Sequence, residues 1–228
     1  MMESVLLVLS AVVGWVGGGL VNWAADILPS IGGNNASNIA ERRHWWQSWA
    51  PFRSVPDRRH SLMIIVGVVL AMFMAWHWGW GLTLLVGWLY GFFLLAVIVI
   101  DFEHHRVLNM MLVPAAVVAA VLSALPWTPE SLGNLVNALL GGAVGFGVFL
   151  LLAIVGRGAL GMGDVKLAGV IGLMTGYPDV LWALIIGALV GAGAAIVLLI
   201  SRKATRKTAI AYAPYLAFGA FVVLWVRL

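Results

Sequence analysis

The sequence predicts an all-α polytopic membrane protein with about eight transmembrane helices. The first observation is composition: 63% of the 228 residues are hydrophobic and only 10% are charged. That balance requires lipid rather than water around most of the surface. The second is a series of apolar runs, most of them about as long as a membrane span. The third is the placement of Lys and Arg residues between these runs. We therefore interpret residues 1–228 as one membrane-embedded domain with a polar insertion at 28–60.

The eight apolar segments account for most of the chain. They cover residues 4–27, 61–78, 81–100, 107–125, 132–155, 165–177, 179–200 and 210–227. The first lacks the basic start of a cleavable signal peptide, so we interpret it as a retained span. The sixth is short for a span, which favours a tilted or partly re-entrant helix.

Nearly all basic residues fall on one side of the predicted bilayer. Of the thirteen Lys and Arg residues, only Arg227 lies on the other side. The twelve are Arg42, Arg43, Arg53, Arg58, Arg59, Arg106, Arg157, Lys166, Arg202, Lys203, Arg206 and Lys207. Because cytoplasmic loops are enriched in Lys and Arg, we expect these connections in the cytoplasm and both termini outside. Segment 28–60 is then a short cytoplasmic loop domain, within which residues 37–52 predict an amphipathic helix in the headgroup plane.

Several classes of protein are excluded or disfavoured. The chain has no cysteine, which excludes disulfides and Cys-ligated zinc. No basic stripe is interleaved with aromatic residues on a soluble face, so we expect no nucleic-acid partner. His104 and His105 have no third ligand at a suitable spacing, so we predict no metal site and interpret both as interfacial polar residues. The rows of small residues predict helix-packing faces; they contain Gly141, Gly142, Gly145, Gly187 and Gly191.

Two carboxylates each lie directly at the cytoplasmic end of a predicted span. Asp101 follows the run that ends at Ile100, and Asp164 lies in the glycine-rich break 161–166. Taken alone, the break also fits a tight turn in which Asp164 caps the next helix. If helix packing brings the two together, one keeps its proton while the other is charged. Such a pair supplies a general acid and a general base for peptide hydrolysis, without a metal or a covalent intermediate.

Four separated stretches resemble the type IV prepilin peptidases, which are membrane aspartyl proteases of the G-x-G-D class. The second-aspartate motif of that family resembles Gly161-Met162-Gly163-Asp164-Val165-Lys166-Leu167. Asp101 followed by Val107-Leu108-Asn109 resembles the family's first-aspartate motif, with Leu108 in place of the usual proline. The N-terminal signature resembles Asn22 through Leu28-Pro29, and the C-terminal element resembles Ala213-Pro214-Tyr215-Leu216-Ala217-Phe218-Gly219.

The resemblance implies a catalytic role for Asp101 and Asp164. It also implies motif or structural support from Gly161, Gly163, Lys166 and Asn109. The implied activity is cleavage of the leader peptide of prepilin-like or pseudopilin proteins at the cytoplasmic face of a prokaryotic inner membrane. The substrate helix would lie in the bilayer beside the enzyme. The resemblance implies no cofactor for the peptidase reaction.

The polar loop departs from the pattern of many family members, which carry two zinc-binding Cys pairs there. Those members also methylate the new N-terminus with S-adenosylmethionine. Loop 28–60 has no cysteine, so we expect a short-loop variant without zinc. S-adenosylmethionine is expected as a cofactor only if the methyltransferase activity is retained.

Two other functions remain open at this point. One is another intramembrane aspartyl protease, such as a presenilin-like or preflagellin-type enzyme. The other is a proton-coupled transporter that uses Asp101 and Asp164 as proton carriers. A transporter would more often place its acids near mid-span and show a repeat relation between its halves, and the sequence shows neither.

Overall fold

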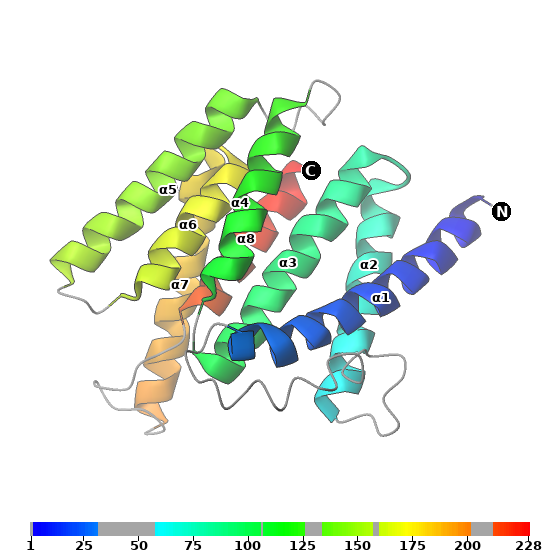
Figure 1. Ribbon diagram of the computed structural model, residues 1–228, viewed down its shortest axis with the longest axis horizontal. Coiled ribbons are helices and arrows are strands. Elements are labelled where there is room, and N and C mark those ends of the chain that lie inside the picture. Colours follow the sequence, from blue (N-terminus) through cyan, green and yellow to red (C-terminus); the bar gives the residue numbers. More distant parts are fainter. Residues whose placement is uncertain (1, 32–57, 106, 126–133, 157–159, 202–211) are drawn as a thin grey trace. The chain divides into compact units, whose positions relative to one another are not determined.

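The computed structural model describes residues 2–31, 58–105, 107–125, 134–156, 160–201 and 212–228. Within these residues the chain forms eight helices and no strand (Figure 1). The helices are α1 (Met2–Ile31), α2 (Arg58–Trp78), α3 (Leu82–His104), α4 (Asn109–Ala124), α5 (Leu135–Val155), α6 (Met162–Thr175), α7 (Asp179–Ile200) and α8 (Ala213–Arg227). Each predicted apolar segment coincides with one of them, which confirms the all-helical expectation.

Helices α1, α2, α3 and α6 extend beyond the predicted spans. Helix α1 continues past residue 27 with Pro29 inside it. Helix α3 continues through Asp101 to His104, and it ends where His105 adopts a positive φ of 49°. Asp101 therefore lies in the last turn of a helix rather than after it. The amphipathic helix predicted at 37–52 lies outside the described residues.

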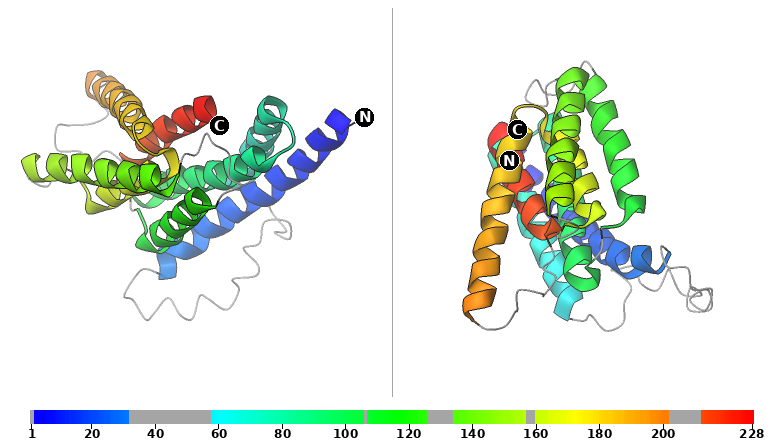
Figure 2. Two further views of the ribbon diagram at one scale, coloured as in Figure 1. Left: turned by 90° about the horizontal axis from the view of Figure 1, so that it is seen from above. Right: turned by 90° about the vertical axis from the view of Figure 1, so that its left-hand side faces the viewer.

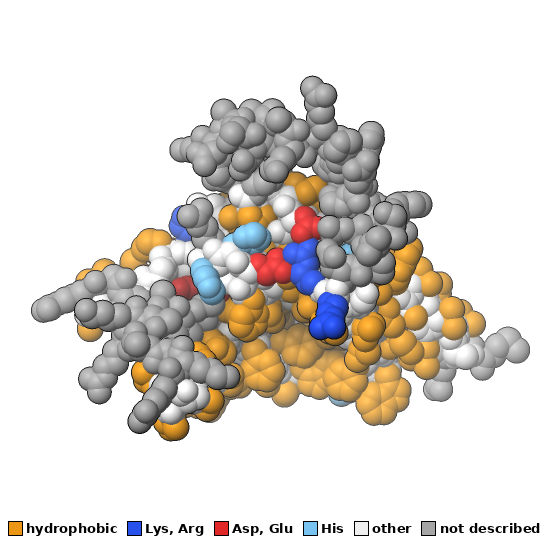
Figure 3. Space-filling model, turned by 90° about the horizontal axis from the view of Figure 1, so that it is seen from below, with side chains coloured by type: hydrophobic (Ala, Val, Ile, Leu, Met, Phe, Trp, Pro, Cys, Tyr) orange, Lys and Arg blue, Asp and Glu red, His pale blue; other side chains and the backbone are white. Residues whose placement is uncertain are grey.

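Five of the described helices are long and apolar enough to cross a membrane, namely α1, α2, α3, α5 and α7. Helices α4 and α8 are shorter but also apolar. Helix α6 has only 14 residues, and eight of them are buried. It packs against α4, α5, α7 and α8, so its apolar side chains contact protein on several sides. The described surface in Figure 3 is mainly hydrophobic, as expected for a protein surrounded by lipid.

The chain divides into two compact units, Met1–Ile100 and Asp101–Leu228, and the boundary falls inside α3. In the first unit, α1 and α2 approach closely because glycines face each other. A Cβ atom added to Gly14 would lie 2.5 Å from the carbonyl oxygen of Gly67. Trp88 Nε1 of α3 donates a hydrogen bond to the carbonyl oxygen of Ala71 in α2, at 3.2 Å. Small residues and one indole therefore hold the three helices together.

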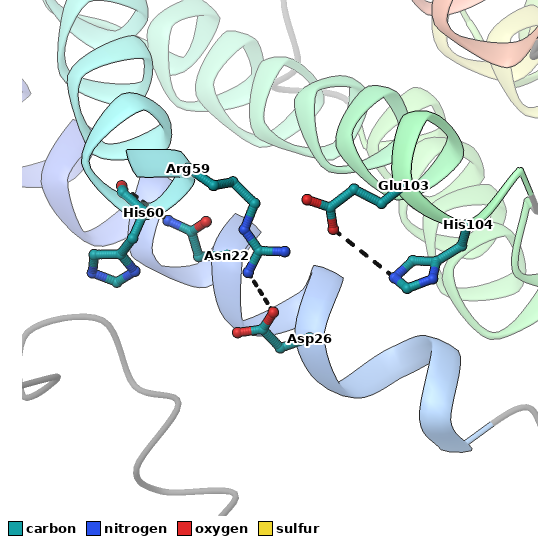
Figure 4. Close-up of polar contacts among 6 residues, drawn as sticks. All are labelled: Asn22, Asp26, Arg59, His60, Glu103 and His104. Atoms are coloured by element: carbon teal, nitrogen blue, oxygen red, sulfur yellow. Dashed lines mark hydrogen bonds and ion pairs between the residues drawn. The ribbon is translucent and has the colours of Figure 1, made fainter. Parts of the chain in front are cut away.

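Polar side chains also join α1 to α2 (Figure 4). Arg59 forms an ion pair with Asp26. Asn22 is fully buried, and its Nδ2 donates to the carbonyl oxygen of His60 at 3.3 Å. Asn22 opens the N-terminal signature noted in the sequence, and in the structure it fastens α1 to the first turn of α2.

The second unit contains α4 and two closely packed helix pairs, α5–α6 and α7–α8, which can be followed in both views of Figure 2. In the α5–α6 pair, a Cβ atom on Gly141 would lie 2.3 Å from the carbonyl oxygen of Gly172. In the α7–α8 pair, a Cβ atom on Gly187 would lie 2.9 Å from the carbonyl oxygen of Tyr215. The predicted packing roles of Gly141 and Gly187 are therefore confirmed.

Candidate active site

Asp164 lies in the first turn of α6, at the third helical position after the N-cap residue Gly161. Its carboxylate accepts a hydrogen bond from the backbone N–H of Gly161, as the acidic residue of a capping box does. The interpretation of Asp164 as part of a helix cap is thus compatible with the structure. A cap alone does not require the half-burial of this side chain or a second carboxylate beside it.

The two glycines of the break act through space rather than through unusual backbone angles. Gly161 has a φ of −71°, which any residue can adopt. A Cβ atom on Gly161 would lie 3.4 Å from Asp164 Oδ2, and a Cβ atom on Gly163 would lie 3.0 Å from Val107 Cβ. Gly163 therefore lets the start of α6 approach the segment that precedes α4.

Asp101 lies at the end of α3 and is only 4% exposed. Its carboxylate accepts a hydrogen bond from the backbone N–H of Ala213, at the start of α8, and the imidazole of His105 lies nearby. Burial, the largest effect, raises the pKa of the Asp101 carboxyl, and a positive charge on His105 and the Ala213 N–H group only partly offset this rise. Its Oδ2 atom is buried and finds no hydrogen-bond donor among the described residues. A buried carboxylate oxygen without a donor is unusual, and a water molecule or a substrate group is the kind of partner it requires.

The fold brings Asp101 and Asp164 close enough for their charges to interact, although they are 63 residues apart in sequence. Burial, and then the negative charge of Asp101, raise the pKa of Asp164 to about 6, while the Gly161 N–H opposes this rise. A carboxyl group with such a pKa holds its proton about two pH units longer than an ordinary Asp. The pair can therefore exist with one proton between two carboxylates up to about pH 6.

The other two predicted support residues also meet. Lys166 Nζ donates a hydrogen bond to Asn109 Oδ1 at 2.9 Å, which links α6 to the first residue of α4. Both side chains are exposed. This contact joins the two aspartate motifs, because Asn109 ends the first motif at the start of α4 and Lys166 belongs to the second motif in α6.

The structure adds residues that the sequence interpretation did not select. Tyr212 precedes α8, and burial followed by the charge of Asp164 raises the pKa of its phenol. Its ring lies against Phe149 of α5 and Tyr215 of α8, with ring centroids 6.0 and 6.5 Å away. In the sequence, Tyr212 could have been selected because it immediately precedes the C-terminal motif that starts at Ala213.

The two adjacent histidines separate in the structure. His104 Nε2 lies 3.9 Å from Glu103 Oε2, at the exposed end of α3 (Figure 4). His105 instead lies close to Asp101. Interpreting both as plain interfacial residues was therefore incomplete for His105. In the described part of the chain, no three His, Asp or Glu side chains form a group that could hold a metal ion.

Comparison with known proteins finds a family that resembles the segment containing this site. Residues 88–196, which contain both aspartates, Asn109 and Lys166, match the type IV leader peptidase family. In this segment, the chain is similar to that family. The match leaves α1, α2 and α8 outside, although α8 supplies the N–H group that faces Asp101.

Three curated relatives carry the name prepilin leader peptidase/N-methyltransferase. The one from Stutzerimonas stutzeri is 28% identical over 177 residues, or 74% of this chain and 58% of the relative. The one from Pseudomonas aeruginosa is 28% identical over 176 residues, covering 73% and 58%. The one from Xanthomonas campestris is 26% identical over 206 residues, covering 81% and 69%. The match thus spans only 58% of the length of the first two relatives. No solved structure matches the chain.

Proposed function

We propose that this protein is a membrane aspartyl endopeptidase that removes the leader peptide from prepilin-like or pseudopilin proteins. The proximity of Asp101 and Asp164 within the family-matched segment is the observation that carries the proposal. The names of the relatives support the substrate class. The buried, unpaired Oδ2 of Asp101 and the raised pKa of Asp164 support the chemistry.

In the proposed mechanism, the two carboxylates divide the tasks of base and acid. Asp101 accepts a proton from a water molecule that attacks the scissile carbonyl. A positive charge on His105 and the Ala213 N–H group favour its charged form against the opposing effect of burial. Asp164, which holds its proton up to about pH 6, donates that proton as the peptide bond breaks. Tyr212 lies near Asp164 and offers a phenol that can donate a hydrogen bond to it. No metal takes part in these steps.

The proposed topology has eight spans in an inner membrane, both termini outside, and the acid pair at the cytoplasmic face. In the second unit, Arg227 and Asp179 form an ion pair of 2.9 Å, which supports placing α7's start and α8's end on one side. A cysteine replacing Ser201, at the other end of α7, should resist an impermeant thiol reagent added outside intact cells. A cysteine replacing the exposed Tyr177 should react. If the cysteine at position 201 were labelled and the one at position 177 were not, the proposed orientation would be wrong.

The direct test of the function is incubation of the purified chain with a synthetic prepilin, followed by mass spectrometry of the product. We expect a mature fragment that begins after the leader. Because the sequence has no cysteine for a zinc site, chelators should leave the cleavage rate unchanged. In our proposal S-adenosylmethionine is needed only if the chain also methylates the new N-terminus, which the product mass reports. Absence of cleavage, with a folded protein, would contradict the proposed function.

The pH dependence of cleavage should report the shared proton. We expect kcat/KM to fall as the pH rises through about 6, because Asp164 then loses the proton it must donate. It should also fall in strong acid, where both carboxyls are protonated, which gives a bell-shaped profile for the pair. An alkaline limb near pH 4, the pKa of an ordinary Asp, would contradict the coupling.

A further inference from the structure

A groove of about 550 Å³ lies between α4, α5 and α6, within the second unit. Most of its lining is apolar, including Val113 of α4, Phe146 of α5 and Leu173 of α6. Only Asn109 and Lys166 bring polar side chains to it. The groove therefore has an apolar body and a single polar end at the start of α4 and α6.

The polar end presents an oriented positive charge. The hydrogen bond of 2.9 Å from Lys166 Nζ to Asn109 Oδ1 holds the ammonium group at this end. Among the described residues, Lys166 forms no ion pair, and its side chain is exposed. Lysine binds phosphate as a point charge, and the amide NH₂ of Asn109 can add a second donor.

The dimensions of the groove favour a flexible hydrocarbon chain over a helix. From Lys166 to Leu173, α6 rises by roughly 10 Å. A helix about 10 to 12 Å across would lie partly outside a groove of about 550 Å³, whereas a single acyl chain can follow the apolar lining along its length. Free phosphate, in turn, would leave the apolar body unused.

We propose that this groove binds one anionic phospholipid, with its phosphate at Lys166 and Asn109 and an acyl chain along α6. Basic sites between membrane helices on the cytoplasmic side bind anionic headgroups for the same electrostatic reason. The bound lipid would cover the α4–α6 junction, two residues from Asp164 on the same helix. Such a site is independent of the cleavage reaction and goes beyond the proposed peptidase function.

The test measures lipid retention on the full-length protein by native mass spectrometry. The protein is released from nanodiscs that contain phosphatidylglycerol and phosphatidylcholine in equal amounts, with the same acyl chains. We expect wild type to retain phosphatidylglycerol preferentially. Lys166→Met should reduce that preference about fivefold, the effect of one cation at a membrane surface, and Lys166→Arg should preserve it.

A second pair of variants tests the apolar body. Ala143 lines the groove and is exposed, so Ala143→Phe should fill the space and reduce retention of both lipids. Ala192→Phe, at an exposed position of α7 outside the groove, is the matched control and should retain lipid as wild type does.

Three results would overturn the proposal. The first is an unchanged lipid preference in folded Lys166→Met. The second is displacement of phosphatidylglycerol by glycerol 3-phosphate, which would identify a free phosphate site. The third is Ala143→Phe that retains both lipids normally but raises KM for a prepilin, which would assign the groove to the substrate helix.

Discussion

Asp101→Asn and Asp164→Asn are each expected to abolish leader cleavage, with a loss in kcat of about 10² to 10⁴-fold. Asn preserves the size of each side chain but can neither accept nor donate the transferred proton. Both variants should fold, because a neutral amide is cheaper than a carboxylate at a buried position. The double variant should be scarcely slower than either single one, since members of one catalytic unit are not additive. Rates are measured on a synthetic prepilin in defined vesicles.

Glu103→Gln is the matched control for this experiment. Glu103 is two residues from Asp101 on the same helix, but its side chain is exposed and is turned toward His104. This variant should keep most of the activity and the pH profile of wild type. Near wild-type cleavage by a folded Asp164→Asn protein would reduce Asp164 to a helix-capping residue. Additive losses in the double variant would indicate that the two aspartates act separately.

The second large effect is expected from Gly141→Ala in α5. A Cβ atom at this position would lie 2.3 Å from the Gly172 carbonyl oxygen and 2.7 Å from Gly176 Cα, both of which are backbone atoms. Backbone cannot rotate away as a side chain can, so α5 and α6 must separate. We expect a loss in stability of about 1 to 3 kcal/mol. Because α6 carries Asp164, cleavage should fall as well.

Gly147→Ala on the same helix provides the control, since a Cβ atom there meets nothing within 4 Å. It should stabilise the helix by up to about 1 kcal/mol, because alanine is the better helix former. The apparent melting temperatures of the two variants in detergent should therefore differ by roughly 5 to 15 °C. Equal melting temperatures would show that the α5–α6 contact is looser than the structure indicates.

The sequence alone determined the helical class and the position of each helix. Apolar side chains must leave water, and the length of each apolar run sets the length of the helix that contains it. It also pointed to Asp101 and Asp164, because a carboxylate at the end of an apolar run is costly and therefore noticeable. The expected packing faces at Gly141 and Gly187 followed from the same reasoning about small residues.

Only the tertiary structure decided what surrounds those carboxylates. No local pattern predicts that the α8 N-terminus at Ala213 faces Asp101, or that Tyr212 lies near Asp164, because these contacts join segments more than 40 residues apart. The end of α3 depends on the positive φ of His105, a backbone conformation that is uncommon for residues other than glycine. The raised pKa of Asp164 likewise arises from burial and a neighbouring charge, which exist only once the helices have packed.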